Sequence, residues 1–172
     1  MARVDFTNLM EPIEPTFDQP KRYRRVKNDS FYPGVEIEVY VNEADKDDVY
    51  LAPRSVCEIL GLNRNWLNTS YQRASVLDRL VRLGFNPEKR MVDVLVEKSA
   101  THLHRPCVAL DRKDFDALMD YAVSIGKKDA IAIQNAFMLL GLLGVAGLSN
   151  NPAEDREAFI RLHEQCKREL GV

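Results

Sequence analysis

The sequence lacks the features of a secreted or metal-stabilised protein. Its 172 residues include only three cysteines, Cys57, Cys107 and Cys166, which are far apart and form no CxxC motif. We therefore expect neither a disulfide framework nor a cysteine-rich zinc site, and a reducing environment fits best. The amino terminus has no apolar segment of the kind found in secretory signals, so the expected location is the cytoplasm.

Long apolar runs and an excess of positive charge are also missing. The longest nearly apolar stretch, residues 137–148, is too short to cross a bilayer as a helix, so no membrane partner is expected. The 24 Lys and Arg residues stand against 26 Asp and Glu, which leaves a formal net charge of -2. This balance excludes a uniformly basic nucleic-acid-binding surface, but it allows a local basic patch that is offset by acid elsewhere.

The signature motifs of common enzymes are absent. There is no P-loop, GxGxxG, GxSxG or HExxH, so we expect no cofactor and no enzymatic activity. The enzyme alternative is a metal-dependent nuclease that uses Asp93 and Glu97, because clustered carboxylates can hold a metal ion and activate water. Lys98, which such a site would also use, is turned to the other side by strand alternation.

A further hypothesis of metal binding concerns His102, His104 and Cys107, with Asp111 as a fourth ligand. Imidazole and thiolate groups are zinc ligands, and a site needs three or four of them. Because no CxxC or HxxxH pair accompanies these residues, we interpret them as packing or as the rim of a binding site, and we predict no metal.

What the sequence does contain is a succession of clear strand patterns, in a chain that is 45% hydrophobic. Alternating apolar residues predict a hairpin of strands 35–41 and 49–51, and a second hairpin of strands 91–96 and 106–110. The side chains expected to be buried on the first strand are Val35, Ile37, Val39 and Val41.

Residues 53–83 predict two helices joined near Gly61, which is the spacing of a helix-turn-helix. In such units the second helix enters the major groove of DNA. Its polar side would carry long or amide-bearing side chains, and Arg can pair with guanine while Asn and Gln can pair with adenine. The DNA contacts predicted from this unit are Arg54, Arg64, Asn65, Asn68, Thr69, Gln72 and Arg73.

Capping signals predict a helical carboxyl-terminal half, with helices near 112–125, 129–143 and 153–170. The predicted fold class is therefore α+β: an N-terminal hairpin, a helix-turn-helix, a second hairpin and then helices. We divide the chain into a flexible basic arm at 1–34, a DNA-binding domain at 35–110, and a helical dimerisation region at 111–172. The alternative is that residues 111–172 form one domain with 35–110. The uncharged stretch 137–148 is either a core helix or the interface of a homodimer.

The arm contains the segment KRYRRVK, in which five of seven side chains are basic. Flexible basic arms bind phosphates or the minor groove. The DNA contacts predicted from this arm are Lys21, Arg22, Arg24, Arg25 and Lys27. The alternative interpretation is a solvated basic tail.

The layout also resembles a known group of proteins. A strand pair followed by YLAPRSVCEILGL, a polar helix and a later ALDRKDFDALMDYA helix is similar to phage antirepressor proteins with BRO-N-type domains. The similarity covers residues 35–140, although the helix that begins at Pro53 lacks the usual acidic start of that family. The resemblance implies a DNA-binding module of a phage or mobile element.

We therefore expect a sequence-specific transcriptional regulator that binds double-stranded DNA as a homodimer. The basic charge is concentrated at 21–27 and 54–90, as phosphate binding requires. The main alternative is a protein–protein adaptor that makes no contact with DNA.

Overall fold

The computed structural model describes residues 21–28, 37–69, 73–98, 101–145 and 152–172. Within these ranges the chain has a mixed α+β fold, in which one five-stranded sheet is combined with six helices. The predicted fold class is thereby confirmed. None of the described helices combines the length and the apolar character that crossing a bilayer requires.

The sheet is built from two hairpins around a central strand. Its strands are β1 (Arg22–Asn28), β2 (Ile37–Asn42), β3 (Val49–Leu51), β4 (Met91–Lys98) and β5 (Thr101–Val108). Their order is β3-β2-β1-β4-β5, with β1 antiparallel to β2 and parallel to β4. The antiparallel pairs β2–β3 and β4–β5 confirm the two predicted hairpins. Because β4 pairs with β1, the second hairpin belongs to the same sheet as the first.

The sheet curls until its two edges meet. Leu51 of β3 and Leu110, which follows β5, exchange two backbone hydrogen bonds with N···O distances of 2.8 and 3.0 Å. On the inner side, Tyr23, Tyr40 and Val94 are almost completely buried, with exposed fractions of 3%, 4% and 0%. These residues form a core of the sheet that is enclosed by its own curvature.

The buried face of β2 was predicted wrongly. Ile37, Val39 and Val41 are only half-buried on the outer side, whereas Tyr40 and Asn42 are buried on the inner side. Val35 lies outside the described residues. Alternation separates the two faces of a strand, but the curvature of the whole sheet decides which face is enclosed.

The basic segment 21–27 is not a flexible arm, and this prediction was also wrong. Residues 22–28 form β1, which is bonded to β2 on one side and, at Arg22 to Arg24, to β4 on the other. Tyr23 anchors the strand in the inner core, and the long basic side chains extend from the two faces toward solvent. A strand can carry many arginines when their charged ends remain hydrated.

The helices occupy two groups along the chain. They are α1 (Pro53–Ile59), α2 (Trp66–Thr69), α3 (Ala74–Arg82), α4 (Arg112–Ser124), α5 (Lys128–Val145) and α6 (Pro152–Leu170). The last three confirm the predicted helical half. The start of α4 confirms the predicted capping pair, because Asp111 accepts from the Asp114 amide at 2.9 Å and Asp114 accepts from the Asp111 amide at 3.0 Å.

The second helix of the predicted helix-turn-helix is divided. Arg73 has an extended backbone (φ -79°, ψ 118°) and precedes α3, so α2 and α3 are separate helices. On α3 the side chain of Leu80 is buried, whereas the side chain of Val81 is 43% exposed.

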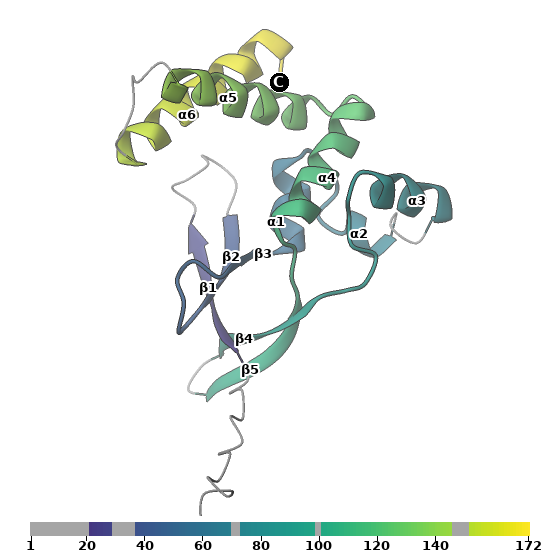
Figure 1. The fold of residues 1–172 in the computed structure, drawn as a ribbon, viewed down its shortest axis with the longest axis vertical. Helices are drawn as coiled ribbons and strands as arrows, with labels where there is room; N and C mark the ends of the chain where they lie inside the picture. The colour runs from purple at the N-terminus through teal and green to yellow at the C-terminus, as the bar shows by residue number, and fades with distance from the viewer. Residues whose placement is uncertain (1–20, 29–36, 70–72, 99–100, 146–151) are drawn as a thin grey trace, which may run out of the picture.

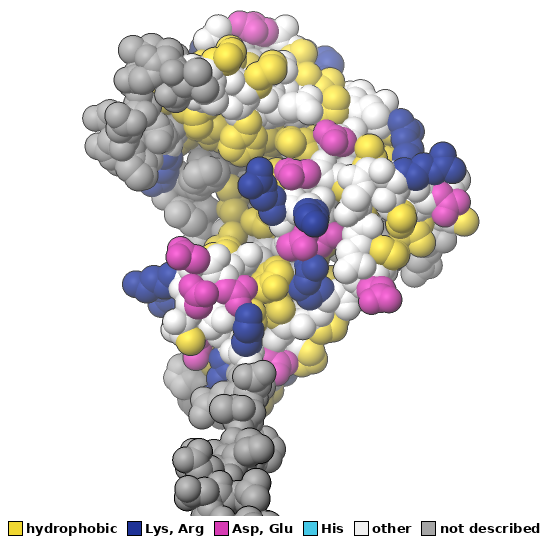
Figure 2. Space-filling model, viewed as in Figure 1, with side chains coloured by type: hydrophobic (Ala, Val, Ile, Leu, Met, Phe, Trp, Pro, Cys, Tyr) yellow, Lys and Arg dark blue, Asp and Glu magenta, His cyan; other side chains and the backbone are white. Residues whose placement is uncertain are grey.

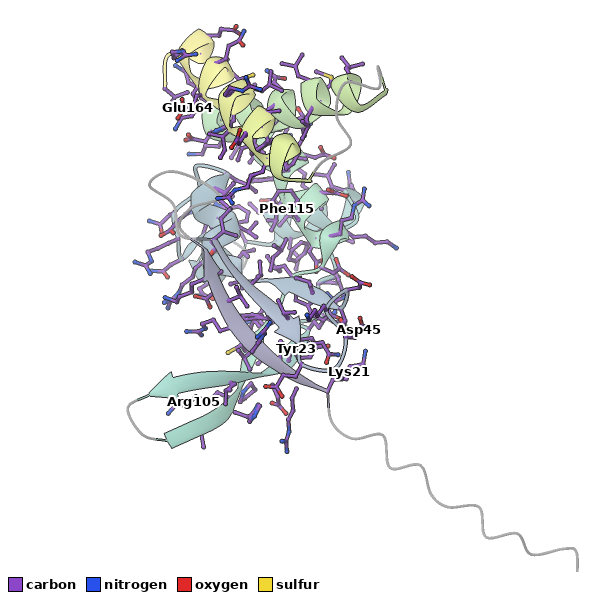
Figure 3. All side chains as sticks on the ribbon, turned by 90° about the vertical axis from the view of Figure 1, so that its left-hand side faces the viewer. Lys21, Tyr23, Asp45, Arg105, Phe115 and Glu164 are labelled. Carbon is purple, nitrogen blue, oxygen red and sulfur yellow. The ribbon has the colours of Figure 1, made fainter. Side chains whose placement is uncertain are left out.

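Figure 1 shows the resulting arrangement: α1, α2, α3 and α4 lie beside the upper edge of the sheet, and α5 with α6 forms a layer at the top. A second core joins these helices, with Leu60, Leu80 and Leu118 completely buried in it. In Figure 3, Phe115 lies below the α5–α6 layer, while Glu164 and Arg105 mark opposite ends of the molecule.

Candidate functional site

An open groove lies where the inner face of the sheet meets the beginning of α1. It has a volume of about 390 Å³. The residues that line it come from β1, β2, β5, α2 and the start of α1, and they are Arg25, Glu38, Tyr40, Ala52, Pro53, Arg54, Asn68, Cys107 and Val108. The groove thus brings together three of the predicted DNA contacts, Arg25, Arg54 and Asn68, although they are separated widely in sequence.

The groove carries a fixed pair of charges and one additional arginine. Arg25 Nε lies 2.9 Å from Glu38 Oε1, and the Glu38 amide donates to Ser55 Oγ at 3.0 Å. Arg54 is exposed at the start of α1 and has no ion pair to any residue that the structure describes. Two arginines against one glutamate leave one net positive charge in the lining.

Tyr40 forms the buried wall of the groove. Burial, and then the nearby Glu38 carboxylate, raise the pKa of Tyr40 to about 12. Its hydroxyl group therefore stays protonated at neutral pH. Glu38 and Tyr40 were not predicted as site residues, because nothing in the sequence indicates that β2 would face α1 across the groove. Cys107, which was interpreted as packing or as the rim of a binding site, lies in the lining of the groove.

A smaller hollow of about 60 Å³ adjoins the groove and shares Pro53, Asn68 and Val108 with it. Lys89 and Arg90 also line this smaller hollow. Asn68 therefore lines both hollows, the larger one together with Arg25 and Arg54 and the smaller one together with Lys89.

The Arg90 side of this surface is held by an ion-pair network. Arg90 donates to Asp111 at 2.9 Å and to Asp114 at 3.2 Å, and Asp114 also accepts from the Asn86 amide at 3.0 Å. Burial disfavours ionisation of Asp111, but the Asp114 amide and the Arg90 charge outweigh it and lower the pKa of Asp111. Arg90 also lies over the Tyr50 ring, 5.3 Å from its centre, so its charge is used inside the protein.

The other basic residues of the segment 21–27 are directed to different places. Lys21 is paired with Asp48 at 3.0 Å, and Asp48 also accepts from Tyr23 and Asn42 at 3.0 and 2.9 Å. The hydrogen bond from Asn42, helped by those from Lys21 and Tyr23, lowers the pKa of Asp48. Figure 3 shows Lys21 and Tyr23 beside the loop that holds Asp45.

Strand alternation divides the rest of the basic segment between two faces. Arg25 and Lys27 lie on the inner side with Tyr23, whereas Arg22 and Arg24 lie on the outer side. The segment therefore does not present its five predicted contacts together. The cause is the two-residue period of a strand, which a flexible arm would not have.

The remaining predicted contacts lie outside the groove. Arg64 is beside Glu58, with a distance of 3.7 Å between Nε and Oε1, and Arg73 is exposed before α3. Asn65 is exposed in the turn before α2, where its amide donates to Asn63 Oδ1 at 2.9 Å. The side chain of Thr69 and all of Gln72 lie outside the described residues.

The hypothesised metal ligands do not share a site. His104 is opposite Leu95 and Cys107 is opposite Val92, so alternation places the two on opposite faces of β5. Asp93 is exposed on β4, beside Arg22 and Pro106 of the neighbouring strands, and the side chains of Glu97, Lys98 and His102 are not described. Among the residues that are described, no three His, Cys, Asp or Glu side chains form a metal-binding group.

The charges on the visible surface are mixed. In Figure 2, Lys and Arg alternate with Asp and Glu over the sheet and the neighbouring helices, and no continuous basic field covers this face. The separation of acidic and basic residues along the sequence is therefore not preserved on this face, because the curvature of the sheet and the ion pairs bring acidic and basic segments together.

Comparisons of the chain with protein-family models, with curated proteins and with solved structures found no match. The resemblance in layout to phage antirepressor proteins therefore stays a prediction. The function has to be argued from the geometry of the groove and its surroundings.

Proposed function

We propose that the protein is a DNA-binding regulator that uses the groove between the sheet and α1. The observation that carries this proposal is the meeting of Arg25, Arg54 and Asn68 in one open groove of about 390 Å³. These are two phosphate-binding side chains and one base-reading side chain, supplied by three different elements. Lys89, which lines the smaller hollow together with Asn68, adds a further positive side chain.

Each side chain has a defined task in this proposal. Arg54, which is exposed and has no described ion pair, binds a phosphate group and displaces its counterions. Arg25 is held in place by Glu38 and retains guanidinium donors for a second phosphate. Asn68 is exposed beside them, and its amide can make the paired hydrogen bonds that identify adenine.

This mode of binding differs from the one that the sequence indicated. A continuous recognition helix is not available, since α2 ends at Thr69 and α3 begins at Ala74. The proposed contacts instead come from a strand, the start of one short helix and a second short helix. The double-stranded DNA partner stays the same, and the contact surface is new.

Arg54→Ala tests the phosphate contact. We expect it to weaken binding to random-sequence duplex DNA and to reduce the slope of log K against log salt by about 0.9, the value of one lost phosphate contact. Fluorescence anisotropy across a salt series measures both quantities. Arg161→Ala is the matched control, because it removes the same charge from an exposed position on α6.

Asn68→Ala tests the reading of bases. We expect the variant to bind random duplex as well as the original chain, and to lose about 1–3 kcal/mol of preference at one position of a selected site. Selection from a random duplex library, followed by affinity measurements on single-base changes, gives the comparison. No affinity of the unaltered protein for DNA at low salt, or equal effects of Arg54→Ala and Arg161→Ala, contradicts the proposal.

A further inference from the structure

Helix α5 is apolar on nearly every side. From Ala130 to its end at Val145 it contains no charged residue, and its few polar side chains include Gln134 and Asn135. A surface helix of a monomeric protein normally has a charged or polar side that faces water. A helix without such a side is expected to be covered all round.

Of the α5 side chains that the structure describes, those on one side are covered and those on the other are not. Ile133 and Ala136 are buried, with exposed fractions of 2% and 0%, and the Phe137 ring packs on Phe159 of α6 with centres 4.7 Å apart. On the other side, Met138 and Leu142 are 60% and 62% exposed.

We call the exposed side the outer face of α5. It consists of Met138, Gly141 and Leu142, with Phe137 and Leu139 exposed by 44% and 36% at its borders. Figure 2 shows hydrophobic side chains gathered over and beneath this helix. Contiguous apolar patches of this kind indicate a site of association.

We propose that the outer face of α5 pairs with the same face of a second copy of the chain, antiparallel and around a two-fold axis near Met138. The face is uncharged, so it is complementary to itself and repels no like charge. In this arrangement Lys127 and Lys128, which precede the apolar stretch, lie at opposite ends of the pair in the two copies. The helix dipoles also oppose each other, which favours this direction.

The shape of the face agrees with a centre at Met138. Gly141 and Asn135 are each three residues from that centre, so the glycine of one copy faces the asparagine of the other. A side chain added at Gly141 would meet nothing within 4 Å, which leaves space for the opposite amide group. A polar residue inside such a helix pair is a common device for fixing its register.

The size of the face predicts a weak dimer. Its exposed side chains provide a few hundred Å² in each copy, which belongs to the class of small, concentration-dependent interfaces. A membrane surface is a poorer occupant, because helices that lie on membranes carry Lys or Arg beside their apolar face. Between residues 130 and 145 there are none.

The mass in solution tests this pairing. We expect sedimentation equilibrium to give a mass that rises from 19.7 kDa toward twice that value as the concentration reaches the high micromolar range. Met138→Glu should weaken self-association at least about tenfold, because it places a charge at the centre of the pair. The matched control is Met91→Glu on β4, a methionine that is 51% exposed, and it should leave the association unchanged.

Crosslinking provides a second measurement that does not depend on disrupting the helix. Met138→Cys should form a disulfide-linked dimer under mild oxidation, because the two-fold axis brings the two sulfur atoms together, and Met91→Cys should not. A mass that stays at 19.7 kDa at every concentration, or association that Met138→Glu does not alter, overturns the proposal. Dimerisation without any affinity for DNA contradicts only the proposed function, and DNA binding by a strict monomer contradicts only the dimer.

Discussion

The sheet with α1 to α4 and the pair α5–α6 use their side chains in opposite ways. In the first region several charged groups are paired within the protein, since Asp48 accepts three side-chain hydrogen bonds and Asp114 accepts one from Arg90. In the second region α5 leaves Met138 and Leu142 exposed to water. Because exposed acidic and basic residues are mixed on the visible face of the first region, the groove that gathers Arg25 and Arg54 is its most informative surface. In the second region the exposed apolar face of α5 is the most informative surface.

The largest expected effect separates the buried network of the first region from its surface charges. Asp114→Ala should lower the free energy of unfolding by about 3–5 kcal/mol, since it leaves Arg90 without its most buried partner and the Asn86 amide without an acceptor. The Asp114 side chain is only 4% exposed, so water cannot replace these bonds easily. Urea denaturation measures the change.

The control for this change lies on the same helix. Asp116 is 52% exposed and is 3.8 Å from Arg112, so Asp116→Ala should change the free energy of unfolding by less than about 0.5 kcal/mol. Similar losses in the two variants would mean that the Arg90 network is no stronger than a surface ion pair. Buried and exposed ion pairs would then contribute equally to the free energy of unfolding.

A fall in pH should reduce stability through the second region before it does so through the first. Burial, and to a smaller extent the Lys167 charge, lower the pKa of His163 on α6 from its ordinary value of 6.5 to about 4. The unfolded chain therefore takes up this proton more readily than the folded chain. Stability from the neutral imidazole is complete above about pH 6.5 and is lost as the pH falls toward 4, by on the order of 2–3 kcal/mol.

The carboxylates of the first region should respond only at lower pH. The pKa of Asp48 is lowered in the folded state from its ordinary value of 3.8, so its stabilisation is present above that value and is lost as the pH falls further. Unfolding measured from pH 7 to pH 4 should therefore show a smaller loss in His163→Phe than in the unaltered chain, because phenylalanine binds no proton. Equal losses would assign the acid sensitivity to other groups.

A smaller effect tests the contact between the two regions. Gly61 ends α1 with a φ of 68°, and a Cβ there would lie 2.6 Å from Oδ2 of Asp129 on α5. Gly126 has a φ of 78° but nothing within 4 Å of such an atom. Both changes to alanine should cost about 1–2 kcal/mol for the left-handed backbone, and Gly61→Ala should cost more because Asp129 must also move. Thermal unfolding of both variants gives the difference, and equal losses would show that the Asp129 contact has no weight.

Much of the fold was predictable because it depends on local signals. The capping signals of the carboxyl-terminal helices and the alternation of both hairpins were recognised from spacing alone. The candidate site was predicted only in part. Arg25, Arg54 and Asn68 were identified as polar contacts, but their meeting with Glu38 and Tyr40 depends on the curl of the sheet.

The errors have one physical origin. A period of two or of 3.6 residues shows that a segment has two sides, but it does not show which neighbour will cover them. The tyrosine side of β2 was enclosed because β3 meets Leu110, and the basic segment became a central strand because β2 and β4 both bond to it. Strand β4 is far in sequence from β1, and Leu110 is far from β3, so no local pattern could specify these contacts.

Local signals along the chain therefore determined where the three carboxyl-terminal helices lie, which segments alternate, and that residues 130–145 carry no charge. The curl of the sheet decided that the basic segment divides between two faces and that Arg25, Arg54 and Asn68 line one groove. The packing of α6 decided which side of α5 stays exposed. Backbone propensity and capping act over a few residues, whereas contacts between distant segments exist only after the chain has folded.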